Sequence, residues 1–248
     1  QKDEKREIML HTIEIYFLLF LTYAFLGWCM EVTCKLIQFK RFINRGFLVG
    51  PYCPIYGWGA LAITLLLQRY TNDIIVLFVM AVIVCSFIEY FTSYFMEKKY
   101  HARWWDYSNK KFNINGRICL DTMIPFGILG VFIMYVSNPF FIDIYTNIPD
   151  IWLHIIAGIL FTLYIIDNIV SSRIISSIHV EEEKIADNTE EITNEIATKI
   201  KQLLKQKSWL HRRLVNAYPN FRFEKLELIK ERLEKQKQKI AKKLEKKQ

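Results

Sequence analysis

The feature that most constrains this chain is a series of long apolar runs separated by segments that carry most of the charge. Of the 248 residues, 52% are hydrophobic and 23% are charged, so both kinds are abundant but kept apart. A helix needs about 20 residues to cross the hydrocarbon core of a bilayer. Five runs are candidate spans: His11 to Met30, Ile55 to Leu67, Ile74 to Met96, Cys119 to Val136 and Trp152 to Val170. The sequence therefore predicts an all-α membrane protein, a polytopic helix bundle of about five spans.

The second run, Ile55 to Leu67, admits two interpretations. It is short, and Pro51 and Pro54 stand at its start. Proline is common in the first turn of a helix, which fits a full span. The alternative is a re-entrant half-helix that enters and leaves the same leaflet, which requires irregular backbone to be buried in protein or to line a cavity. The sequence leaves both interpretations open.

The loops indicate how the spans are oriented, because short cytoplasmic loops carry an excess of lysine and arginine. Basic residues gather after the first, third and fifth runs, for example at Lys40, Lys99 and Arg173, whereas residues 137–150 contain none. We therefore expect a multi-pass membrane protein with its N-terminus outside and its C-terminus in the cytoplasm. We expect no secretory signal peptide, because the first run is too long for the apolar part of one.

The chain changes character near Arg173, which predicts a transmembrane helical domain at residues 1–172 and a basic cytoplasmic helical tail at residues 173–248. In the tail, isoleucine and leucine recur at helical spacing in Glu181 to Lys205 and in Phe223 to Lys247. This pattern predicts a helical hairpin or coiled coil. The hairpin either packs beneath the membrane domain or docks a partner or anionic lipid, since a basic residue near an anionic leaflet contributes about 1 kcal/mol.

Polar residues gather at the predicted cytoplasmic ends of the spans. Glu31 closes the first run, and "NRGFLVGPYCPIYGWG", Asn44 to Gly59, follows it with four glycines and two prolines. Glycine lets backbone approach backbone or ligand closely, and exposed N–H groups beside Arg45 would suit an anion. The segment contains neither a P-loop pattern nor GxGxxG, so nucleotide binding by a known loop is not supported. A tightly turned entry to the second span is the alternative interpretation.

The third run carries a polar stripe. Glu89, Ser93 and Glu97 recur every four residues, so on a helix they share one face, which should point to protein or a water-filled cavity and not to lipid. The connector that follows combines tryptophans, which interfacial anchoring explains, with acidic, amide and guanidinium groups, which it does not. Donors, acceptors and aromatic faces at one membrane edge predict a cytoplasmic-side pocket for a small polar or anionic solute or a lipid headgroup.

The predicted site has two parts. The substrate-binding residues are Glu31, Arg45, Glu89, Trp105, Asp106, Tyr107, Asn113 and Arg117, and the loop-forming residues are Gly46, Gly50, Pro51, Pro54 and Gly57. Asp121 lies within reach of the same rim, and Asp167 is expected to form hydrogen bonds between helices. Cysteines near cytoplasmic ends should be free thiols. No metal and no cofactor are expected, because a site made of Cys29, Cys34, Cys53 and His101 matches no zinc spacing.

Five segments carry a resemblance to a known family: "GWCMEV", "NRGFLVGPYCPIYGWG", "EYFTSYFMEKKYHARWWDYS", "FNINGRICL" and, in the tail, "HRRLVNAYPN". In this order they resemble the successive signatures of the bacterial putative ABC-transporter permease family, type IV, over nearly the whole chain. The resemblance implies a polytopic cytoplasmic-membrane protein, and its signature positions include Gly116 and every residue of the predicted site. At Asp121 the sequence departs from the family pattern, which makes Asp121 a weaker site candidate.

Three classes of function are compatible with these features. The first is a transport subunit, which needs a separate ATPase chain because this one has no P-loop, and which needs an oligomer or a partner permease because five spans are few. The second is a membrane-embedded enzyme acting on a lipid or lipid-linked substrate, with Glu31, Glu89 or Asp106 as acid or base and arginines holding phosphate. The third is a scaffold or regulator that docks a partner through the tail. The lipid bilayer is a partner in all three, nucleic acid is expected in none, and transport leads.

Overall fold

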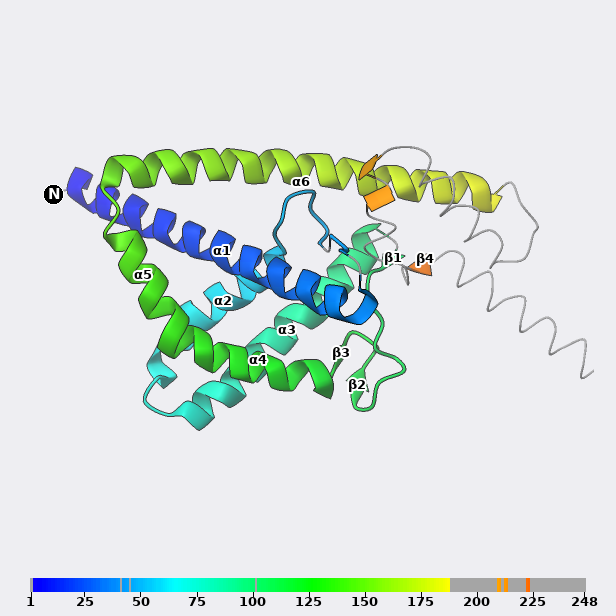
Figure 1. Cartoon of the computed structure of the whole chain (residues 1–248), viewed down its shortest axis with the longest axis horizontal. Helices are drawn as coiled ribbons and strands as arrows, with labels where there is room; N and C mark the ends of the chain where they lie inside the picture. Colours follow the sequence, from blue (N-terminus) through cyan, green and yellow to red (C-terminus); the bar gives the residue numbers. More distant parts are fainter. Residues whose placement is uncertain are drawn as a thin grey trace, which may run out of the picture. The chain divides into compact units, whose positions relative to one another are not determined.

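The structure is a computed structural model that describes residues 2–40, 42–44, 46–100, 102–187, 209–210, 212–213 and 222–223. Its helices are α1 (Lys2–Phe39), α2 (Pro54–Leu66), α3 (Ile74–Tyr100), α4 (Leu120–Phe132), α5 (Asn138–Thr146) and α6 (Asp150–Asp187), with the 3-10 turn η1 (Gln68–Tyr70) and the π-helical turn η2 (Ile133–Ser137) between them. The strands β1 (Ala102–Arg103), β2 (Asn113–Ile114), β3 (Ile118–Cys119) and β4 (Arg222–Phe223) form two small antiparallel pairs, β1 with β4 and β2 with β3 (Figure 1).

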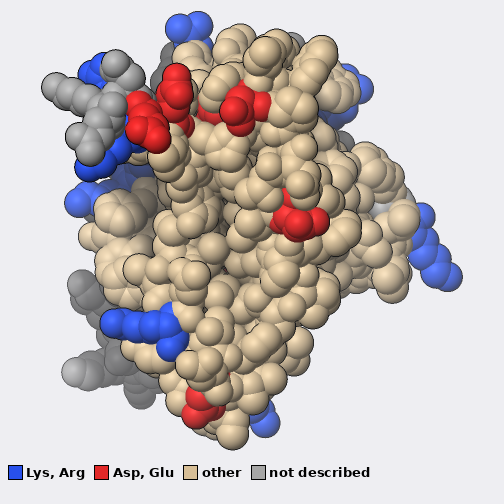
Figure 2. All heavy atoms as spheres, turned by 90° about the vertical axis from the view of Figure 1, so that its left-hand side faces the viewer, with Lys and Arg blue, Asp and Glu red and all other residues tan. Residues whose placement is uncertain are grey.

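Four stretches of the described chain are long and apolar enough to cross a membrane: Glu4–Phe39, Ile74–Tyr100, Leu120–Thr146 and Asp150–Ile175. Large apolar side chains on these stretches are exposed, such as Phe87 at 62% and Ile159 at 56%, as expected where a helix faces lipid. Figure 2 shows a face on which isolated charged side chains are separated by wide uncharged areas. The prediction of an all-α membrane helix bundle is confirmed.

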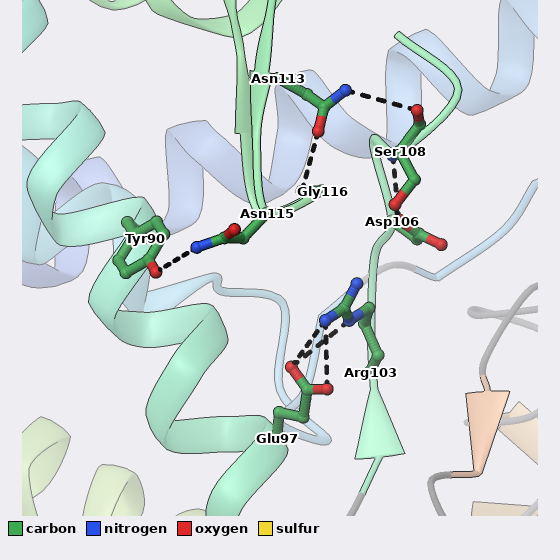
Figure 3. Close-up of polar contacts among 8 residues, drawn as sticks. All are labelled: Tyr90, Glu97, Arg103, Asp106, Ser108, Asn113, Asn115 and Gly116. Atoms are coloured by element: carbon green, nitrogen blue, oxygen red, sulfur yellow. Dashed lines mark hydrogen bonds and ion pairs between the residues drawn. The ribbon is translucent and has the colours of Figure 1, made fainter. Parts of the chain in front are cut away.

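The chain divides into two compact units. Unit 1 comprises Gln1–Thr92 and Asp106–Ser171, and unit 2 comprises Ser93–Trp105 and Ser172–Gln248. Within unit 2, the Arg103 guanidinium pairs with the Glu97 carboxylate at 3.2 Å (Figure 3). The last helix continues past the predicted end of the fifth span to Asp187, so the start of the tail is helical. The predicted hairpin or coiled coil of the tail lies outside the described residues, and the domain boundary at residue 172 stays a prediction.

Close contact between α1 and α2 organises unit 1. A Cβ on Gly57 would lie 2.5 Å from the Phe20 carbonyl oxygen, and a Cβ on Gly27 would lie 2.3 Å from the Tyr56 ring. Leu19, at 0% exposed, lies in the core that the two helices share. Helix α6 lies beside α1 in this unit, where the rings of Phe17 and Phe161 meet edge to face with centroids 5.6 Å apart. Only glycine, at positions 27 and 57, permits α1 and α2 to approach so closely.

A buried polar chain crosses the middle of unit 1 at the π-helical turn. The Tyr23 hydroxyl donates to Asn138 Oδ1 at 2.7 Å, and Asn138 Nδ2 donates to Thr64 Oγ1 at 2.8 Å. Asn138 is 4% exposed and follows η2 directly. Because its amide finds partners on α1 and α2, the polar side chain is satisfied within the bundle, as buried polar groups require.

Helix α2 is too short to cross a bilayer alone. Its 13 residues span about 20 Å, compared with about 30 Å of hydrocarbon. The N–H of Cys53, just before α2, donates to the Ala24 carbonyl at 2.8 Å, which places the preceding loop at the depth of Ala24 and not at that of Glu31. From there α2 runs to Leu67, which packs with Leu77 at the other end of the unit. The loop and α2 therefore traverse unit 1 together.

Candidate functional site

Two glutamates from different helices form the centre of a polar group at one end of unit 1. The Tyr56 hydroxyl on α2 donates to Glu31 Oε1 on α1 at 2.8 Å. The Tyr107 hydroxyl donates to Glu89 Oε1 on α3, and Thr122 Oγ1 on α4 donates to Glu89 Oε2, both at 3.3 Å. We call these five residues the rim cluster. Four helices and the connector after α3 each contribute one residue.

The rim cluster is acidic and half-buried, with Glu89 its most buried member. Glu89 is 7% exposed. Burial, together with the Coulombic influence of Glu89 and then of Glu31, raises the pKa of the Tyr107 phenol above its usual value. Because both carboxylates act on the same hydroxyl, they lie close together although they are far apart in sequence. The Tyr107 phenol therefore remains a neutral hydrogen-bond donor at neutral pH.

The β2–β3 hairpin holds Tyr107 in place. Asn113 Oδ1 accepts from the Gly116 N–H at 3.0 Å, and Asn115 Nδ2 donates to the Tyr90 hydroxyl on α3 at 2.9 Å (Figure 3). The turn uses φ of 53° at Asn115 and 66° at Gly116, a conformation that asparagine and glycine tolerate best. The Tyr107 N–H donates to the Gly116 carbonyl at 2.8 Å. Asn113 and Gly116 thus act on the cluster by positioning Tyr107.

The remaining predicted residues have local roles in the described chain. The Asp106 carboxylate accepts from the Ser108 N–H at 2.9 Å and closes a turn in the connector (Figure 3). The Arg117 guanidinium lies over the Tyr90 ring, 5.6 Å from its centroid. Asp121 is exposed and pairs with Lys110 at 3.1 Å. The predicted site residue Trp105 lies in unit 2, and Arg45 lies outside the described residues.

A second polar group fixes the glycine-rich loop to α6. The Asp167 carboxylate accepts from the N–H groups of Val49 at 2.9 Å and Gly50 at 2.7 Å, and from the hydroxyls of Tyr52 at 2.5 Å and Ser171 at 2.8 Å. We call these five residues the loop clamp. The clamp supplies partners for backbone groups that would otherwise be unpaired at membrane depth.

The predicted loop-forming residues have steric roles around the clamp. A Cβ on Gly50 would lie 2.3 Å from the Tyr52 ring, and Gly46 has φ of 121°, where a side chain would be strained. Pro51 lies in the bend, and Pro54 opens α2 in its first turn. Gly57 provides the contact with α1 described above. Asp167, which was expected to bond to another helix, binds the backbone of this loop instead.

The structure brings together three of the predicted substrate-binding residues, Glu31, Glu89 and Tyr107. Sequence reasoning missed Tyr56, Thr122 and the role of Asp167. A groove of about 580 Å³ lies at the opposite end of α2 from Tyr56, lined by Leu65, Leu66, Gln68 and Arg69. Cys29, Cys34, Cys53, Cys85 and Cys119 are free thiols. Among the described residues, no three His, Cys, Asp or Glu side chains gather as metal ligands do, and His101 lies outside those residues.

The fold and the site define a helical membrane protein with a half-buried polar cluster at one end of its bundle. The family model described as "Putative ABC-transporter type IV" matches residues 18–172. The chain belongs to this family, and the resemblance found in its sequence is confirmed. No curated protein and no solved structure matches the chain. Membership supports a transporter-like, membrane-embedded protein.

Proposed function

We propose that this chain is the membrane subunit of a transporter and that its rim cluster binds a small polar solute. The observation that carries the proposal is that carboxylates from two different helices lie near the half-buried Tyr107 hydroxyl: it donates to Glu89 at 3.3 Å, and Glu31 acts on it electrostatically. Carboxylates in a membrane bundle that face protein mark solute and ion pathways more often than they serve stability. The cluster joins the ends of several helices, so a bound solute would contact elements that can move relative to one another.

The hydrogen bonds of the cluster support exchange with a solute. Tyr107 and Thr122 each lie 3.3 Å from Glu89, whereas ordinary O–H···O bonds are about 2.7–2.8 Å. Bonds of this length are weak, so a solute that donates to Glu89 loses little by replacing them. An anionic solute or a lipid headgroup is the alternative ligand. It would need the guanidinium groups that the sequence assigns to this rim, those of Arg45 and Arg117.

The proposal also assigns a membrane side and partners. Lys98 and Lys99 stand in the last turn of α3, at the end of the helix beyond Glu89, which favours the cytoplasmic side of a bacterial cytoplasmic membrane. The energy for transport would come from a separate ATPase chain, as the family name suggests. Assembly into an oligomer and binding of anionic lipid by the basic tail complete the proposed arrangement.

A thermal-unfolding screen of the full chain in lipid nanodiscs tests the solute site. The panel contains zwitterionic amino acids, neutral sugars and inorganic phosphate, because these separate polar from anionic ligands. We expect an amino acid or a sugar to raise the unfolding temperature of the wild type and to have no effect on E31Q. D143N is the matched control, since Asp143 is exposed on α5 and outside the cluster.

Three outcomes would contradict the proposal. One is that no member of the panel shifts the wild type. Another is that the same compound stabilises E31Q and the wild type equally. The third is that E31Q unfolds at a lower temperature than the wild type and that this difference is the same with and without each compound. That result would favour the scaffold interpretation. Stabilisation by phosphate alone would replace the polar solute with the anionic alternative.

A further inference from the structure

Glu89 lacks a positive partner. Its two carboxylate oxygens accept from the hydroxyls of Tyr107 and Thr122, and among the described residues it forms no ion pair. At 7% exposed, the carboxylate is almost removed from solvent. Burying a carboxylate is costly unless a positive charge compensates it. Hydroxyl donors reduce that cost but leave the net charge in place.

A second polar side chain near Glu89 lacks a hydrogen-bond partner in the described part of the chain. Ser86 is 6% exposed, and its hydroxyl oxygen has no hydrogen-bond partner in the described part of the chain. A serine inside a helix usually bonds to the carbonyl four residues earlier, so an unpaired buried hydroxyl is unusual and costs free energy. Ser86 precedes Glu89 by three residues on α3, which places both on one face of the helix. The unpaired oxygen therefore shares a helix face with the buried Glu89 carboxyl group.

The chemistry of these oxygens limits what they bind. A carboxylate and hydroxyl oxygens are hard ligands, which suit alkali and alkaline-earth cations. Tyr107 donates its proton to Glu89 and keeps its oxygen lone pairs. Thr122 Oγ1, in contrast, also donates to the Cys119 carbonyl at 2.9 Å and accepts from the Cys119 N–H at 3.4 Å, which leaves it one lone pair. A divalent ion ordinarily takes several carboxylates, whereas Glu89 is the one carboxylate of this site, because Glu31 accepts from the Tyr56 hydroxyl at 2.8 Å.

We propose that Glu89, Ser86, Tyr107 and Thr122 form a binding site for a small monovalent cation, sodium or potassium. The cation compensates the charge of Glu89 and completes the coordination of Ser86. The ion site shares Glu89, Tyr107 and Thr122 with the rim cluster and adds Ser86, but ion binding does not require that the cluster takes a solute. If both bind, they share Glu89, so each changes the affinity of the other.

Equilibrium binding to the purified full chain in nanodiscs tests the site. The probes are radioactive sodium and radioactive rubidium, the latter a tracer for potassium, with N-methylglucamine chloride keeping the ionic strength constant. We expect saturable binding of one of the two ions to the wild type and no saturable binding to E89Q. E97Q is the matched control, because Glu97 lies on the same helix and already pairs with Arg103. It should bind the ion as the wild type does.

S86A separates a binding role from a structural one. The Ser86 hydroxyl has no partner to lose, so without either ion S86A should unfold at the wild-type temperature or slightly above it. The apparent affinity of S86A for the ion should be several-fold lower than that of the wild type. This variant keeps the proposal testable even if E89Q folds poorly.

Several results would overturn the cation site. They are the absence of saturable binding of either ion to the wild type, undiminished binding by E89Q, and undiminished affinity in S86A. A pH series covers the proton as a competing occupant, with Glu31, Cys85, Tyr107 and Cys119 as the other titratable groups near Glu89. Stability that depends on pH through Glu89 but never on sodium or potassium would mean that a proton alone occupies the site.

Discussion

A single carboxylate decides where the glycine-rich loop lies. Asp167 accepts four hydrogen bonds, two of them from backbone N–H groups of the loop. Unpaired N–H groups at this depth would each cost free energy, because no water is present to replace the missing acceptor. Hydrogen bonds to an ionised acceptor are stronger than those to a neutral one, so aspartate suits this position better than asparagine.

We therefore expect D167N to release the loop. The amide turns one acceptor into a donor facing Gly50 and Tyr52, and a hydrogen bond to a charged group contributes about 1.5–3 kcal/mol. The free energy of unfolding should fall by about 3 kcal/mol. Cys53, 7% exposed beside the loop, should react faster with a maleimide in a variant where it is the only cysteine. D143N is the control, and equal labelling rates in D167N and the wild type would contradict the role of the clamp.

Tyr107 should make the protein sensitive to alkali. Its pKa is raised by burial and by the carboxylates of Glu89 and Glu31. The unfolded phenol ionises at about pH 10. Above that pH the folded state binds more protons than the unfolded state, so stability is fully present below about pH 10 and falls as the pH rises further. We expect denaturant unfolding to show a shallower alkaline decline in Y107F. An unchanged slope in Y107F would refute this prediction.

At this scale the sequence predicted which groups are polar and buried, but not all of their partners. The four-residue spacing of Glu89, Ser93 and Glu97 predicted one face turned away from lipid, and Glu89 and Ser93 are indeed buried. Tyr56 and Thr122 were not predicted, because a hydroxyl group in a sequence does not by itself indicate a site. Only the packing of the helices brings these hydroxyls to a carboxylate. Asp167 was recognised, but spacing along one helix does not reveal that a loop more than 100 residues earlier supplies its donors.

Among the elements, the contact between α1 and α2 depends on Gly57. A Cβ there would lie 2.5 Å from the Phe20 carbonyl oxygen, a backbone atom that cannot move without shifting α1. We expect G57A to destabilise the protein by about 2 kcal/mol, as overpacking does. Gly158 on α6 offers the matched control, since a Cβ there meets nothing within 4 Å. G158A should be neutral or stabilising by up to about 1 kcal/mol. Equal unfolding temperatures of the two variants would contradict the close approach.

The helix ends show where sequence patterns are weakest. The fourth run was expected to end at Val136. The helical path instead continues through η2 and α5 to Thr146. It does so because Pro139 falls at the start of α5, where no N–H is needed, and because Asn138 finds partners on two other helices. Only the tertiary packing reveals the second of these reasons.

For the whole molecule, the prediction with the most consequences is the orientation in the membrane. We expect the connection between α5 and α6 to face the outside and the β2–β3 hairpin to face the cytoplasm. In a variant without native cysteines, D143C should react with a membrane-impermeant maleimide in intact cells. K110C should react only after the membrane is permeabilised. The reverse pattern would invert the orientation and move the rim cluster to the outer side.

The loop that precedes α2 has an irregular backbone, but it lies in the same surroundings as a membrane-spanning helix. Irregular segments usually exchange their amide hydrogens with solvent quickly, whereas the amides of Val49 and Gly50 are bonded to Asp167. Deuterium uptake there should be as slow as in a packed helix, and the slow exchange should vanish in D167N. A map of exchange rates would then class this stretch with the helices, and secondary structure alone would misjudge which part of the chain opens first.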